Sequence, residues 1–228
     1  MAGPWFRPAL FRFLRDLARN NRREWFLAQR ERYEQDVRGP ALHFIAALAH
    51  PLRRVSPHVV ANPARVGGSL FRVQRDTRFH RGGAPYKPWV GIRLYHERRR
   101  DVHAPAFYLH LEPGACFIAA GLWRPEAPVL KRVRGFVADN PDAWRRAAHA
   151  PAFRRDFRLG GDSLVRAPGG FPADHPLVED LKRKDFIAVQ DVADSEVLAP
   201  GFDRFAMARV RRLAPLVDYL CAALDLDF

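Results

Sequence analysis

Apolar positions recur every three to four residues over the first quarter of the chain, a spacing typical of helices with one buried side. The first such stretch predicts a helix over residues 8–19. Asn21 is expected to cap a second helix, because Glu24 lies three residues on and can complete a reciprocal capping box. Gly39 and Pro40 are expected to break that helix, with Pro40 as the first residue of a further one.

From residue 69 the apolar period changes from 3.6 to 2, which is the alternation of a half-buried strand. Pro113 and Gly114 supply turn residues between two such stretches and predict a hairpin there. Because no helix is expected between the strands, they form an antiparallel sheet, and one face of such a sheet can stay open to solvent. The strands are expected at 70–79, 89–96, 106–112 and 115–121, with a short further strand at 186–189.

Helical spacing returns after the sheet, and Gly- and Pro-rich stretches interrupt it. Residues 158–176 are expected to form a long irregular crossing, because they hold several Gly and Pro residues. Pro215 lies inside the last apolar seam and is expected to kink or split that helix. The helices are expected at 126–139, 141–149, 176–184 and 203–224.

These elements predict an α+β fold with a central antiparallel sheet of four to six strands, packed by N-terminal and C-terminal helices. The sheet would come from residues 69–121 and the strand near 186–189. A length of 228 residues suits one large domain, and no internal repeat or linker divides it. We therefore expect a single domain over 1–228, helical at 8–54, sheet at 69–121, and helical and irregular at 125–228.

Composition indicates a globular protein without a membrane partner. Hydrophobic residues make up 48% of the chain, but the longest apolar stretches, such as 115–123, fall short of the roughly 18 residues that span a bilayer. The N-terminus has no apolar run of signal-peptide length, so a cytoplasmic location is expected. Cys116 and Cys221 have no CxxC partner and are expected to be small buried hydrophobes.

The net charge of +13 is unevenly distributed. Residues 1–160 hold 30 basic and 13 acidic groups, whereas 161–228 hold 8 and 12. Such a basic body attracts polyanions at low salt through counterion release. Thirty-four of the 38 basic residues are arginine, a bias that the base composition of a genome also produces, so charge alone does not predict a specific nucleic-acid role.

The densest cluster of chemistry-bearing side chains lies between residues 72 and 87. In an extended strand alternate residues share a face, so two guanidinium groups flank the carboxylate of Asp76. Such a group is either a self-satisfied ion network or a cradle in which arginine forks grip a phosphate or carboxylate. The charged face would consist of Arg72, Gln74, Asp76 and Arg78, and the opposite face of Phe71, Val73, Arg75, Thr77 and Phe79.

The loop after this strand adds flexible backbone and two further polar groups. Gly82 and Gly83 allow close approach of the main chain to a ligand, and Tyr86 and Lys87 contribute a phenol and an ammonium. The spacing GxxxxGK[ST] is absent, so this is not a Walker loop. The alternative is that the arginines only tie the loop to the sheet. The candidate ligand-binding residues are Arg72, Arg75, Arg78, Tyr86, Lys87 and, on another strand, Tyr108.

A candidate catalytic histidine lies on the strand predicted at 106–112. Tyr108, His110 and Glu112 point opposite to the apolar residues between them. If this face adjoins the arginine face, His110 can act as a general acid or base, with Asp76 orienting the arginines. The alternative is a histidine that is exposed or satisfied by structural hydrogen bonds.

No motif for a metal, a cofactor or a nucleophile is found. His96, His103 and His110 are spaced seven apart but fall on two strands and a loop, and HExxH, GxSxG and GxGxxG are absent. Aromatic and basic residues interleave at 5–7 and 23–26, a pattern that favours helix core with solvated arginines over a base-stacking platform. No metal and no cofactor are predicted.

The order and spacing of several short segments resemble the domain of unknown function 2461, a family of mainly bacterial proteins. The combination of Arg75-Asp-Thr-Arg-Phe79 with Pro85-Tyr-Lys87 is the specific part, and the similarity runs nearly end to end. The other segments are 13–26, 121–125, 166–171, 174–176 and 184–186. The resemblance implies one compact domain, no established activity, and a family pattern that falls here on Arg72, Arg75, Asp76, Arg78, Tyr86 and Lys87.

One departure from the family pattern stands out. Members often carry an Asp-Lys pair before Pro-Tyr-Lys, where this chain has Gly82 and Gly83, so any charge that the pair supplies is missing here. Two hypotheses follow. The first is a phosphate- or nucleotide-type anion site on 72–87, with His110 as proton carrier if the protein is an enzyme. The second is a non-catalytic module whose basic N-terminal two-thirds bind nucleic acid or an acidic protein.

Overall fold

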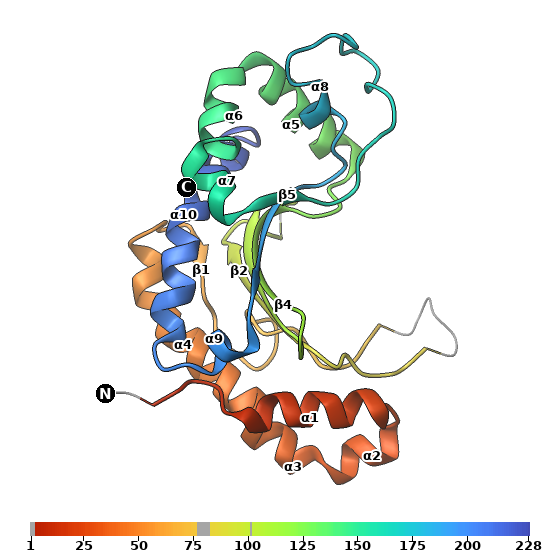
Figure 1. Ribbon diagram of the computed structural model, residues 1–228, viewed down its shortest axis with the longest axis vertical. Helices are drawn as coiled ribbons and strands as arrows, with labels where there is room; N and C mark the ends of the chain where they lie inside the picture. The colour runs from red at the N-terminus through yellow and green to blue at the C-terminus, as the bar shows by residue number, and fades with distance from the viewer. Residues whose placement is uncertain (1–2, 77–82, 101) are drawn as a thin grey trace.

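The computed structural model describes residues 3–76, 83–100 and 102–228. Its α+β architecture confirms the prediction, with one antiparallel sheet, six-stranded within the described residues, packed by helices from both ends of the chain (Figure 1). The strands lie in the spatial order β1-β2-β3-β4-β6-β5. They are β1 (Val59–Val60), β2 (Val90–His96), β3 (Ala106–Leu111), β4 (Cys116–Leu122), β5 (Arg158–Gly160) and β6 (Phe186–Val192).

The middle of the sheet was predictable, whereas its two edges were not. β3 and β4 form the predicted hairpin, and Gly114 in its turn has φ +76°, a conformation that glycine adopts without strain. The strand expected near 186–189 is the longer β6, which pairs with β4. β1 and β5 form the edges and are too short to show an alternating pattern in the sequence.

The predicted helix break at Gly39 and Pro40 is wrong. The helix continues through a π turn, in which the Gly39 N–H donates to the Glu34 carbonyl five residues back. A side chain at position 39 would place its Cβ 2.9 Å from that same oxygen, so glycine suits the turn. The N-terminal elements are α1 (Pro8–Arg19), α2 (Arg23–Ala28), α3 (Arg30–Tyr33), the π turn η1 (Glu34–Arg38) and α4 (Gly39–Arg53).

The C-terminal half follows the predicted order of elements with shifted bounds. The irregular crossing expected at 158–176 contains β5, and the short helix after it covers four residues. Pro215 does not split the last helix, which runs through it as one element. The C-terminal helices are α5 (Ala127–Asp139), α6 (Pro141–Ala148), α7 (Pro151–Asp156), α8 (Val178–Leu181), α9 (Asp194–Leu198) and α10 (Phe202–Ala222).

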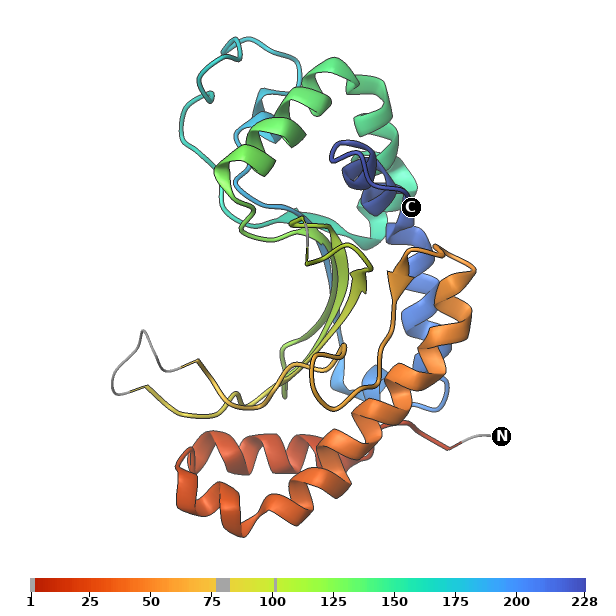
Figure 2. The same ribbon diagram turned by 180° about the vertical axis from the view of Figure 1, so that it is seen from behind.

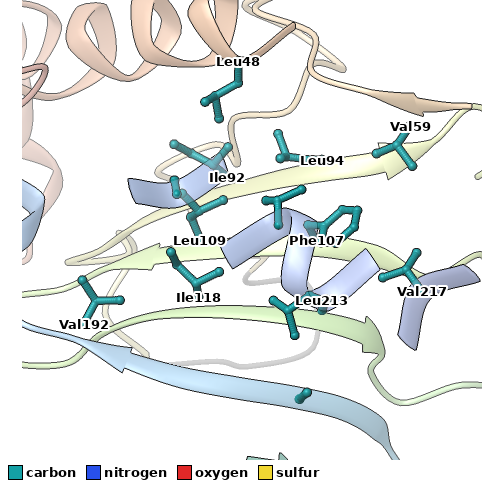
Figure 3. Close-up of a cluster of buried hydrophobic side chains, with 14 of the residues drawn as sticks. Leu48, Val59, Ile92, Leu94, Phe107, Leu109, Ile118, Val192, Leu213 and Val217 are labelled. Atoms are coloured by element: carbon teal, nitrogen blue, oxygen red, sulfur yellow. The ribbon is translucent and has the colours of Figure 1, made fainter. Parts of the chain in front are cut away.

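One cluster of buried hydrophobic residues, from Phe6 to Leu226, joins the N-terminal helices, the sheet and the C-terminal helices. Its centre lies between the sheet and the helices α4 and α10, where fully buried aliphatic side chains interdigitate (Figure 3). Each such side chain stabilises the fold by about 1.5–3 kcal/mol when it leaves water. The side chains at this centre include Leu48 of α4, Ile92, Leu109 and Ile118 of the sheet, and Leu213 and Val217 of α10.

The other face of the curved sheet is concave and has no helix packed flat across it (Figure 2). Helices α1 and α2 border one end of this concavity, and α5 and the crossing after β5 border the other (Figures 1 and 2). Strand alternation turns Arg93 of β2, Tyr108 and His110 of β3, and Phe117 of β4 toward this side. We call it the open face.

Candidate functional site

The strand predicted over 70–79 is only partly a strand. Leu70 pairs with Ile92 of β2 as an isolated bridge, and Gln74 pairs with Tyr86 as a second one. After the first bridge the chain leaves the edge of β2, and residues 72–76 pair with residues 83–88 instead. The alternation predicted for this segment therefore holds only locally, and Phe71 is exposed while Val73 is buried.

Residues 72–76 and 83–88 run side by side and are called the arm. The arm projects from the sheet above α1 and α2 (Figures 1 and 2). Two backbone hydrogen bonds of 2.8 Å join its two stretches, from the N–H groups of Arg75 and Lys87 to the carbonyls of Pro85 and Val73.

The base of the arm is fastened to the N-terminal helices through Tyr86. The Tyr86 ring stacks on Phe26 with 4.2 Å between centroids, and the Asn21 amide bonds both the N–H and the carbonyl of Tyr86 at 2.9 Å. Arg75 Nε donates to the same carbonyl at 3.1 Å. Asn21 was predicted to cap a helix, and this is wrong: α2 starts at Arg23 without a side-chain cap.

The ion cluster predicted on the arm is present in part. Nη2 of Arg72 lies 3.7 Å from Oδ2 of Asp76, and their side chains are 66% and 38% exposed. A pair this exposed contributes about 0–1 kcal/mol to stability, so its structural value is small. Arg75 belongs to the Tyr86 anchor described above. Arg78 lies within residues 77–82, outside the described residues.

Lys87 places an ammonium group beside two aromatic rings. Its Nζ lies 5.6 Å from the Phe71 ring centroid and 5.3 Å from that of Trp89, and it donates to the Arg72 carbonyl at 3.1 Å. Partial burial lowers the pKa of Lys87, and the charges of Arg72 and Arg75 lower it further. The neighbouring cations thus outweigh Asp76, which raises this pKa.

The polar side chains of β3 form a hydrogen-bonded chain on the open face. His110 Nε2 lies 2.8 Å from Glu112 Oε2, and His110 Nδ1 lies 3.1 Å from the Tyr108 hydroxyl. The His110 ring stacks on Phe117 at 4.7 Å and lies 4.9 Å from the Trp89 ring. His110 is therefore buried between two aromatic rings, although it faces the open side of the sheet.

The two contacts of His110 select one tautomer of a neutral imidazole. In that tautomer Nε2 donates to the Glu112 carboxylate, and Nδ1 accepts the Tyr108 hydroxyl proton. Both nitrogens are occupied, and neither offers a free lone pair to a substrate. Burial raises the pKa of Tyr108, with the charge of Glu112 adding to the effect, so this phenol stays a hydrogen-bond donor.

Trp89 contacts both the arm and the hydrogen-bonded side chains of β3. Its ring lies beside both the Lys87 ammonium and the His110 imidazole, and Phe71 lies 5.6 Å from the Tyr108 ring. Lys87, Tyr108 and His110 thus gather around two aromatic rings, whereas Arg75 and Tyr86 anchor the arm to the helices.

Phe71, Trp89 and Gly91 were not among the predicted site residues. An added Cβ at position 91 would lie 2.7 Å from both the Tyr108 hydroxyl and a carbon of the Trp89 ring, so the missing side chain of Gly91 leaves room for both. The alternation of the strand at 89–96 placed Trp89 and Gly91 on one face, but nothing in the sequence said that this face was open.

Other chemistry is sparse among the described residues. They contain no group of three His, Cys, Asp or Glu side chains that could hold a metal ion. Cys116 and Cys221 are buried free thiols, as expected, and burial raises the pKa of each to about 12. No helix within 3–76, 83–100 or 102–228 has the length and hydropathy needed to cross a membrane.

Two other segments that carry the family resemblance, 121–125 and 184–186, lie together away from the arm. The carboxylate of Asp185, which is buried, accepts the Arg124 N–H at 2.6 Å and the Asp162 N–H at 2.9 Å. A Cβ at Gly161 would lie 2.3 Å from the Cβ of Asp185. The segments 121–125 and 184–186 therefore have a structural role. The Asp185 carboxylate, directly before β6, holds two loops in place through hydrogen bonds.

A family model described as a conserved hypothetical protein (DUF2461) matches residues 9–219. No curated protein and no solved structure matches the chain. The segments that carried the family resemblance in the sequence, 13–26, 75–79 and 85–87, include the residues that anchor the arm.

Proposed function

The chain belongs to the DUF2461 family of conserved hypothetical proteins, and we propose that it binds a phosphate-bearing ligand of the nucleotide type where the arm meets the open face. The ligand's phosphate would lie against Lys87 and Arg72, and its planar part would stack on Phe71 and Trp89. Binding, rather than catalysis, is the function proposed.

One observation carries this proposal: an ammonium group sits beside two aromatic rings that adjoin an open sheet surface. Phe71 is 38% exposed, and Trp89 is half-buried. Rings left accessible in this way offer stacking worth about 1–3 kcal/mol for each base. Lysine and arginine side chains supply charge-assisted hydrogen bonds to phosphate oxygens.

The electrostatics of the arm favour an anion. Burial lowers the pKa of Lys87 most, and the like charges of Arg72 and Arg75 lower it further; a bound phosphate would relieve this repulsion. Asp76 balances only part of the charge, and its place beside Arg72 suits the orienting role predicted for it.

His110 is assigned a positioning role in this proposal. Both of its nitrogens are engaged, so it holds the Tyr108 hydroxyl in place on the open face instead of taking a proton from the ligand. With its one proton directed to His110, the Tyr108 hydroxyl oxygen can accept a hydrogen bond from the ligand.

Calorimetric titration with AMP, ATP and adenosine tests the proposal. ATP and AMP should bind more tightly than adenosine, and Lys87→Met should weaken AMP binding by about tenfold, since a hydrogen bond to a charged group contributes about 1.5–3 kcal/mol. Arg12→Met, which removes an exposed cation from α1, is the matched control and should bind as the wild type does. Absence of saturable binding by all three compounds, or equal effects of both variants, would contradict the proposal.

A second candidate function is supported by the surface next to the arm. Helices α1 and α2, below the arm in Figure 1, carry exposed arginines at 12, 15, 19 and 23. Such a surface suits a non-catalytic module for single-stranded nucleic acid, with the aromatic rings as a stacking platform. Affinity for an oligonucleotide that falls steeply between low and physiological salt would favour this alternative, because that dependence reflects released counterions.

A further inference from the structure

A hollow of about 480 Å³ lies at the other end of β2 from the arm, between the β2–β3 connection and the start of α5. Its walls include three guanidinium groups and one imidazole, with a single carboxylate among the described lining residues. The residues that line it are Arg93, Arg99, Arg100, His103, Glu126 and Val129, together with Val102.

Arg93 is a half-buried cation of β2 that faces the open side of the sheet. It lies directly across from Tyr108 in the register of β2 and β3. Arg93 Nη2 donates to the Ala104 carbonyl at 3.4 Å, and no carboxylate of the described residues lies within ion-pair distance of Arg93. Burial lowers the pKa of Arg93, and the nearby charge of Arg99 lowers it further.

Arg99 is held in place before any ligand arrives. Its Nη2 donates to the Gly67 carbonyl at 2.6 Å, and its guanidinium carbon lies 3.3 Å from the centroid of the Tyr95 ring. Tyr95 is itself fixed, because its hydroxyl accepts from the Asn62 amide at 3.2 Å. A guanidinium has five N–H donors, so most of those of Arg99 remain for another partner.

The charge of the hollow is positive among the described residues. Three arginines line the hollow together with Glu126, which is exposed and forms no ion pair with them in the described part of the chain. Asp101, between Arg100 and Val102 in the sequence, lies outside the described residues. Glu126 and Val129 lie at the start of α5, so the N-terminus of this helix is at the wall of the hollow. The N-terminus of a helix favours an anion.

Among the described residues, no carboxylate forms an ion pair with Arg93. A half-buried arginine that stabilises a fold is normally paired with a carboxylate, because an unpaired buried charge is unfavourable. Here two arginines approach one another closely enough for the charge of one to lower the pKa of the other. An anion between them would neutralise both and use their free donors.

We propose that this hollow is a second anion-binding site, which takes a phosphorylated small molecule with its phosphate on Arg93 and Arg99. The volume lies within the range of small-molecule sites, about 300–1,000 Å³, and Val102 and Val129 supply apolar wall for the rest of the ligand. The site shares no residue with the arm, so it does not rest on the function proposed above.

Calorimetry with pyrophosphate and ribose 5-phosphate tests this site. Arg93→Met and Arg99→Met should each weaken binding by about tenfold or more, the loss expected when one charge-assisted contact is removed. Arg211→Met, which removes an exposed cation from α10, should leave it unchanged. The losses should persist when Lys87 is also replaced by Met, which separates this site from the arm. Equal binding by Arg93→Met, Arg99→Met and Arg211→Met, or loss with Lys87→Met alone, would overturn the proposal.

Thermal unfolding of ligand-free Arg93→Met distinguishes binding from a structural role. Methionine removes a cation that no carboxylate of the described residues neutralises and keeps much of the apolar stem, so the Tm should stay the same or rise. A clear fall in Tm would mean that Arg93 serves the fold, and it would overturn the proposal. Binding of an eight-nucleotide oligothymidine alone, with neither small phosphate compound binding, would also overturn it.

Discussion

The amide of Asn21 forms two hydrogen bonds with the backbone of Tyr86, each 2.9 Å long. Nδ2 donates to the Tyr86 carbonyl, and Oδ1 accepts the Tyr86 N–H. In an antiparallel pair, alternate residues direct these groups away from the partner strand, and Tyr86 is such a residue opposite Gln74. Asn21 therefore occupies the place of a neighbouring strand and holds the arm to the helices.

Asn21→Ala should destabilise the protein by about 1–3 kcal/mol, because it leaves the N–H of buried Tyr86 without a partner and the Tyr86 carbonyl with Arg75 alone. Urea unfolding measures this change. Amide hydrogen exchange at Tyr86 should quicken as well. Asn20→Ala is the control, since Asn20 makes one side-chain bond, to the Asp16 carbonyl, and its loss should be smaller and leave exchange at Tyr86 unchanged.

Gly91→Ala should disturb the open face. The new Cβ would lie 2.7 Å from the Tyr108 hydroxyl and the Trp89 ring, so one of them must move, at a cost of about 1–3 kcal/mol. Near-ultraviolet circular dichroism and urea unfolding report the two effects. Gly135→Ala is the opposite case, because it lies inside α5 with no atom within 4 Å of the added Cβ, and it should stabilise by about 0.5–1 kcal/mol. Equal effects at both glycines would contradict this reasoning.

Lys87 should titrate below its ordinary pKa of 10.5. In the pH range between its folded and unfolded pKa values the unfolded chain binds more protons, so the free energy of unfolding rises with pH there. Comparison of the wild type with Lys87→Met isolates this rise, since the other groups are shared. Nuclear magnetic resonance titration of the lysine side chain measures the pKa directly, and saturating AMP should raise it. A pKa at or above 10.5 in the free protein would refute the crowding of charge described for the arm.

Asp185→Ala should be strongly destabilising, by about 2–4 kcal/mol, because it removes the acceptor of two backbone N–H groups from a buried site. Chemical denaturation measures the loss. Asp191→Ala is a matched control on β6, the strand that follows Asp185: its ion pair with Arg158 has side chains 71% and 61% exposed, and its removal should change stability by about 0–1 kcal/mol. Similar losses for both variants would show that Asp185 does not join the loops in the way described.

Much of the fold follows from residue periodicity. The helix over 8–19 and the hairpin around Gly114 were predictable, since each shows a regular apolar period or a turn residue at its centre. The π turn before Pro40 was not, because the sequence signals a break and not how the neighbouring turn adjusts.

The candidate site was predicted in outline only. Alternation put Tyr108 and His110 on one face, but the contact with Lys87 depends on Trp89, which reads as an ordinary strand residue. Asn21 matches a helix cap in sequence, and only the tertiary position of the arm gives it another partner. Arg93 and Arg99 could not be singled out among many arginines, because no local sequence pattern shows which arginines come together around a hollow.

The shortness of β1 and β5 affects how this protein behaves at high concentration. A sheet edge presents unpaired N–H and carbonyl groups, which another chain can use to add a strand and begin aggregation. Here the edges consist of two and three residues, and β5 ends at Gly160. The chain thus leaves little template for edge-to-edge association, and its curved sheet can keep one face accessible without promoting fibre growth.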